Sequence, residues 1–196
     1  MGVSPSTTLV VVGDDARGLI DEAGRFANVR AATFPLTAGG EVQRWINRSK
    51  APYVVHDHDP LGHVAAAWVE FFDDLATLGT LDLEVDRALE KFERAELSMP
   101  DYYVVADPES LPPTWRHWWL GVLPQAAPTR VIPWDATGSE SLARLLRTLP
   151  TSRQWPDPGP WLRRVARTVP DLAGLGEHPL PAPDPEPAPD PEPEPD

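Results

Sequence analysis

Short apolar runs alternate with helical patterns along the first 150 residues, and this alternation constrains the fold more than any other feature. Apolar residues three and four positions apart mark the helices, including one after Gly62 and another over residues 84–97. Strands joined through helices pair in parallel, because each connection returns along one face of the sheet. We therefore predict an α/β, three-layer sandwich with a mostly parallel sheet of about five strands, at residues 8–12, 29–34, 53–55, 102–106 and 131–134.

Composition divides the chain into three parts. Residues 1–150 form the predicted α/β domain, and residues 151–180 an arginine- and tryptophan-containing helical appendage. Residues 181–196 consist of eight prolines, six carboxylates and two alanines. Such a segment has almost no apolar surface to bury, so we expect a disordered, extended, polyproline-like tail.

The same composition excludes several classes of protein. The net charge of −13 excludes a uniformly basic nucleic-acid coat protein, although not a local basic face. The absence of cysteine excludes disulfides and thiolate metal sites. No apolar run approaches the roughly 20 residues needed to span a bilayer, and the N-terminus lacks the pattern of a signal peptide. We expect a soluble, cytoplasmic protein with no membrane association.

Acidic residues follow four of the five predicted strands. Functional groups of parallel sheets gather at the carboxyl ends of the strands. Two carboxylates at positions i and i+2, such as Asp57 and Asp59, can converge on one Mg²⁺ ion, which prefers oxygen ligands. The alternative is that Asp59 caps the next helix while Asp57 bonds to a turn. The candidate metal ligands are Asp14, Asp15, Asp57, Asp59 and Asp107.

At these positions the chain resembles the TOPRIM domain of primases, topoisomerases and some nucleases. The resemblance rests on the strand and turn at residues 9–15 and on the D-x-D-P-x-G motif from Asp57 to Gly62. It implies a TOPRIM-like fold and Mg²⁺-dependent phosphodiester cleavage, with Asp57 and Asp59 as catalytic residues. The glutamate of the family aligns with Val12, so Asp14 or Asp15 would supply the third carboxylate.

Two other interpretations remain open. Receiver domains carry an acidic pair after strand one and an aspartate after strand three, as Asp14, Asp15 and Asp57 do here, but Pro133 and Trp134 stand where receivers have a lysine. The fold prediction therefore includes a TOPRIM-like or a flavodoxin-like sandwich. His56, His58 and His63 also raise the possibility of a zinc site, which their spacing does not favour.

Two functions follow from these patterns. The first is a TOPRIM-like protein that acts on or binds nucleic acid through a basic segment containing Arg144, Arg147, Arg153, Arg163, Arg164 and Arg167. The second is a catalytically inactive interaction module that binds a protein partner through the acidic tail or through the helix bearing Trp115, Trp118 and Trp119. The helical spacing of these three indoles favours a position in the core over a place on a binding surface.

Overall fold

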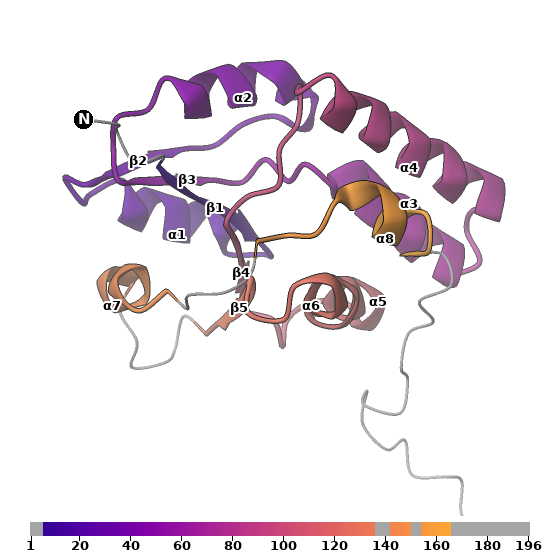
Figure 1. Ribbon diagram of the computed structural model, residues 1–196. Coiled ribbons are helices and arrows are strands. Elements are labelled where there is room, and N and C mark those ends of the chain that lie inside the picture. Colours follow the sequence, from indigo (N-terminus) through magenta and orange to yellow (C-terminus); the bar gives the residue numbers. More distant parts are fainter. Residues whose placement is uncertain (1–5, 136–141, 150–153, 166–196) are drawn as a thin grey trace, which may run out of the picture.

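The computed structural model describes residues 6–135, 142–149 and 154–165. It contains one sheet of five parallel strands with the order β2-β3-β1-β4-β5. This confirms the predicted α/β sandwich, and Figure 1 shows helices on both faces of the sheet. The strands are β1 (Thr7–Val12), β2 (Val29–Ala32), β3 (Tyr53–His56), β4 (Tyr102–Ala106) and β5 (Val131–Trp134).

Alternate side chains of the strands divide the core into two layers. Leu9 and Val11 face one layer, which contains α1 (Ala16–Ala23) and α7 (Leu142–Arg147). Val10 and Val12 face the other layer, which contains α3 (Gly62–Phe72), α4 (Leu78–Glu93) and α8 (Pro158–Leu162). Both layers are apolar, which explains why the central strands are apolar at consecutive positions.

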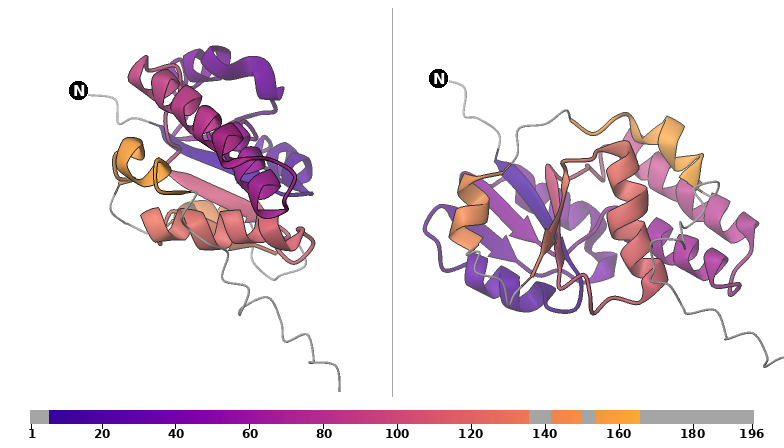
Figure 2. Two further views of the ribbon diagram at one scale, coloured as in Figure 1. Left: turned by 90° about the vertical axis from the view of Figure 1, so that its right-hand side faces the viewer. Right: turned by 90° about the horizontal axis from the view of Figure 1, so that it is seen from below.

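The remaining helical elements connect β2 to β3 and β4 to β5. They are η1 (Leu36–Ala38), α2 (Gly39–Asn47), α5 (Pro113–His117), the π-helical turn η2 (Trp118–Val122) and α6 (Leu123–Ala126). Figure 2 shows α5 and α6 beside the sheet, next to α3 and α4. Trp118 and Trp119 are buried in this layer, as their helical spacing indicated.

One helix begins earlier than its sequence pattern indicated. We expected a helix over residues 84–97, but α4 runs from Leu78 to Glu93. The Thr77 hydroxyl accepts a hydrogen bond from the Thr80 backbone N–H (3.3 Å), which caps the helix at its true start.

The segment after residue 153 is part of the core where it is described. Leu162 and Val165 are buried against α3 and α4. The Trp68 indole donates a hydrogen bond to the carbonyl of Val165 (3.1 Å). Residues 154–165 therefore pack on the α/β domain, in the helical layer that contains α3 and α4. The tail, residues 181–196, lies outside the described residues.

Candidate functional site

Asp57 and Asp59, both expected to ligate a metal ion, are held by different parts of the fold. Asp57 follows β3, and its Oδ1 accepts a hydrogen bond from the backbone N–H of Phe34 (2.7 Å), just beyond β2. This contact fixes the loop after β2 against the end of β3. Asp57 thus has the turn-stabilising role that was the alternative to metal binding.

Asp59 is buried after β3 and bonds to β4, which lies beyond β1 in the sheet. Its Oδ1 accepts hydrogen bonds from the Tyr103 hydroxyl (2.7 Å) and from the backbone N–H of Leu61 (2.9 Å). Its Oδ2 is buried and has no partner among the described residues. Burial raises the pKa of Asp59 to about 6, although both hydrogen bonds oppose the shift. Burial likewise raises the pKa of Tyr103 well above its usual value, and the charge of Asp59 adds to that effect.

The other predicted metal ligands lie after β1 and β4. Asp14 Oδ2 accepts a hydrogen bond from the Ser110 hydroxyl (3.3 Å), which links these two strand ends. Asp107 adopts a left-handed conformation (φ 46°), and its backbone N–H donates to the carbonyl of Trp134 (2.8 Å). The sheet therefore gathers Asp14 and Asp107 at neighbouring strand ends, as predicted from their positions.

The part of the chain that is described does not assemble a metal centre. It contains no group of three or more histidine, aspartate or glutamate side chains arranged to hold an ion. Val12, where TOPRIM domains have their glutamate, is buried among apolar side chains. This arrangement lends no support to a Mg²⁺ site of the TOPRIM type. Mg²⁺ binding and catalysis by Asp57 and Asp59 stay predictions.

Asp15, the remaining predicted metal ligand, lies directly before α1. It is the N-cap residue of this helix, but its side chain accepts no capping hydrogen bond. Its Oδ1 lies close to Gly18 in the first turn of α1, where a Cβ would meet the carboxylate.

Two neutral histidines accompany Asp59 at the end of β3. Burial, followed by the charge of His58, lowers the pKa of His56 to about 3. Burial also lowers the pKa of His58, against the opposing charge of Asp57. Both nitrogens of His56 and the Nδ1 of His58 lack partners among the described residues. A small cavity of about 20 Å³ borders both rings.

A larger cavity of about 280 Å³, which we call the His58 cavity, opens beside Asp59. His58 and Asp59 line it from the end of β3, and Arg87 and Lys91 line it from α4. Its remaining polar lining residues include His63 and Glu84. The His58 cavity thus combines two buried polar residues with exposed cationic side chains. The sequence placed Asp59 and His58 after a strand, but gave no signal that α4 would cover them.

The predicted arginine surface is divided between the two faces of the sheet. Arg144 and Arg147 belong to α7, whose leucines pack in the layer of α1. Arg163 and Arg164 follow α8, in the layer of α3 and α4, and Figures 1 and 2 show α7 and α8 far apart. Arg163 pairs with Asp86 of α4 at 3.0 Å. The described arginines therefore do not form one continuous surface, and Arg153 and Arg167 lie outside the described residues.

The tryptophan helix contributes to the core. Trp118 and Trp119 are buried, and Trp115 is half-buried and stacks on Trp119 with ring centroids 6.2 Å apart. Trp118 also packs against Trp68 of α3 (5.6 Å). The indoles that were candidates for a protein-binding surface therefore pack in the core.

Comparison with known proteins adds no family to this description. No family model matches the chain, and no curated protein or solved structure matches it either. The TOPRIM resemblance therefore stays a prediction based on the residues that carry it. Among the described residues, no helix is long and apolar enough to cross a bilayer.

Proposed function

We propose that this chain is an α/β binding module whose ligand is a small hydroxylated anion, such as a sugar phosphate, held in the His58 cavity. The observation that carries this proposal is a single cavity lined by two buried polar residues, His58 and Asp59, and by two exposed cations, Arg87 and Lys91. The cations suit an anionic group, and the polar residues at the end of β3 suit hydroxyl groups of the same ligand.

The inner wall of the cavity fits a hydroxylated group. Near neutral pH an ionised Asp59 accepts hydrogen bonds, whereas neutral His58 carries one donor and one acceptor nitrogen. Sugar hydroxyls both donate and accept, so they can satisfy both side chains. The volume of about 280 Å³ lies at the small end of the usual range for ligand pockets, which favours a single sugar ring or a smaller molecule.

The exposed part of the lining fits an anion. Arg87 and Lys91 are one turn apart on α4, and both are exposed. Arg87 pairs with Glu84, which orients the guanidinium beside the cavity. Lysine and arginine are the side chains that bind phosphate groups through charge and hydrogen bonds. The exposed His63 adds a third nitrogen donor on the same lining.

Calorimetric titration of the full chain with ribose 5-phosphate tests this proposal. The charge-assisted contact of Lys91 contributes about 1.5–3 kcal/mol, so Lys91→Met should weaken binding at least about tenfold. The matched control is Arg94→Met. Arg94 is an exposed cation three residues further along the chain, and it does not line the cavity. Ribose without phosphate should bind much more weakly than ribose 5-phosphate.

Three results would contradict the proposal. The first is no binding of ribose 5-phosphate. The second is an equal loss of affinity in Lys91→Met and Arg94→Met. The third is binding of a single-stranded oligonucleotide in place of ribose 5-phosphate. Mg²⁺-dependent nicking of plasmid DNA that Asp57→Ala abolishes would instead support the predicted nuclease.

A further inference from the structure

An open groove of about 790 Å³ separates α4 from the segment that contains α8. We call it the Trp155 groove. Phe92 and Met99 line one side, and Trp155 lines the other with neighbouring prolines. Its lining contains three prolines and only three charged side chains, namely Glu93, Asp157 and Arg163. A groove lined by aromatic and proline rings is the type of surface on which polyproline segments dock.

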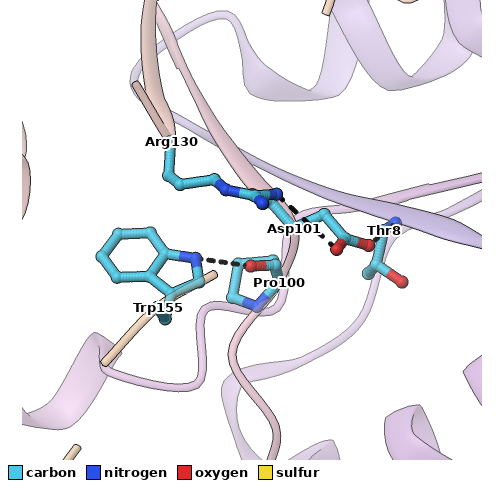
Figure 3. Close-up of polar contacts among 5 residues, drawn as sticks. All are labelled: Thr8, Pro100, Asp101, Arg130 and Trp155. Atoms are coloured by element: carbon cyan, nitrogen blue, oxygen red, sulfur yellow. Dashed lines mark hydrogen bonds and ion pairs between the residues drawn. The ribbon is translucent and has the colours of Figure 1, made fainter. Parts of the chain in front are cut away.

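Contacts deep in the fold hold the indole of Trp155 in place. Its N–H donates a hydrogen bond to the carbonyl of Pro100 (2.7 Å), as Figure 3 shows. The next residue, Asp101, accepts a hydrogen bond from the backbone N–H of Thr8 in β1 (2.8 Å), and its backbone carbonyl accepts one from Arg130 (3.0 Å). The edge of the indole also contacts the ring of Tyr103, with centroids 5.7 Å apart. The groove is therefore preformed, and binding requires little ordering of its wall.

We infer that the Trp155 groove binds the proline-acid tail of the same chain, residues 181–196, in a polyproline II conformation. The described chain ends at Val165, directly after α8, which itself lines the groove. Residues 166–180 connect this point to the tail. A random-coil chain of 15 residues has an end-to-end distance of about 20–23 Å, and a segment tethered at this range has a high effective concentration at the groove.

The sequence of the tail suits this groove for a geometric reason. A polyproline II helix has three residues per turn, whereas the tail has proline at every second position. Successive prolines therefore point in different directions around the helix, so each side of it carries proline rings. Whichever side faces the groove, a proline lies there at every second turn, with an alanine or a carboxylate in the turn between.

Charge alone does not explain the binding. Arg163 attracts the six carboxylates of the tail, but it already pairs with Asp86. Glu93 and Asp157 repel those carboxylates. The attraction must therefore come mainly from packing of proline rings on the aromatic wall, and this distinguishes docking in the groove from general attraction to basic residues.

A nitroxide label placed in the tail tests the inference in the full chain. The chain has no cysteine, so Ala188→Cys provides a single labelling position and changes neither the charge nor the prolines. Docking should broaden the NMR signal of the Trp155 indole N–H, and that of Trp161, which stacks on Trp155 at 6.5 Å. The same signals after reduction of the nitroxide with ascorbate serve as the reference.

Two controls decide between the possible outcomes. Replacing the eight tail prolines by serine keeps all six carboxylates, and it should remove the broadening at Trp155. Tenfold dilution should leave the broadening unchanged, because the contact lies within one chain. The inference is overturned if the Trp155 signal is equally sharp before and after reduction of the nitroxide, if the serine tail has the same effect, or if dilution abolishes the broadening.

Discussion

Replacing Asp59 by asparagine isolates the electrostatic cost of a buried carboxylate at the end of β3. Asparagine keeps an oxygen that can accept the hydrogen bonds of the Tyr103 hydroxyl and the Leu61 N–H. It replaces the partnerless Oδ2 with an amide group and removes the charge. The variant therefore changes the ionisation of this position while it preserves the size of the side chain.

The pH dependence follows from the pKa of Asp59, which burial raises from 3.8 to about 6. Between these values the folded protein binds a proton that the unfolded chain releases, so the contribution of Asp59 to wild-type stability falls as pH rises from about 4 to 6 and then levels off. The cost of ionising Asp59 relative to acid pH is about 2 kcal/mol at pH 5 and about 3 kcal/mol at pH 8. The stability of Asp59→Asn relative to wild type should therefore increase by about 1 kcal/mol from pH 5 to pH 8.

Urea unfolding at pH 5 and at pH 8 measures this change. His56 titrates with the opposite sign in both proteins, so its contribution cancels in the difference between them. Asp82→Asn, which removes an exposed carboxylate from α4, controls for the change in net charge. A stability difference between Asp59→Asn and wild type that is equal at the two pH values would refute the reasoning, as would the same change in Asp82→Asn.

Two further predictions concern a glycine and a histidine of the core. Gly13→Ala should destabilise the fold by at least about 2 kcal/mol in urea unfolding, because Gly13 has φ 104° and its Cβ position lies 2.2 Å from the carbonyl oxygen of Ala106. Gly40→Ala, with open space around it, should be neutral or stabilising, and equal effects would contradict this account. Burial holds the pKa of His56 near 3, below its unfolded value of about 6.5, so the contribution of His56 to wild-type stability should fall by about 2 kcal/mol on acidification to pH 5, which opposes the gain from Asp59. His56→Leu should lack that loss, and parallel pH profiles would show the prediction to be wrong.

The sequence alone determined the class of fold and much of the core. Alternating strand and helix patterns predicted a parallel sheet covered on both faces, since few other arrangements bury such elements. The spacing of Trp115, Trp118 and Trp119 likewise indicated one buried helical face, and these residues pack in the α3 layer. Local periodicity records which side of an element is buried, so these features could be predicted without coordinates.

Only the tertiary structure decided which polar groups meet. Asp57 and Asp59 are two residues apart, yet one bonds to Phe34 and the other to Tyr103, which is 44 residues away along the chain. The order β2-β3-β1-β4-β5 determines these partners, because it places β1 between β3 and β4 and directs each side chain to one layer. It also separates α7 from α8, and with them the arginines that are neighbours in sequence. Such contacts join distant segments, and hydrophobic periodicity carries no information about which segments become neighbours.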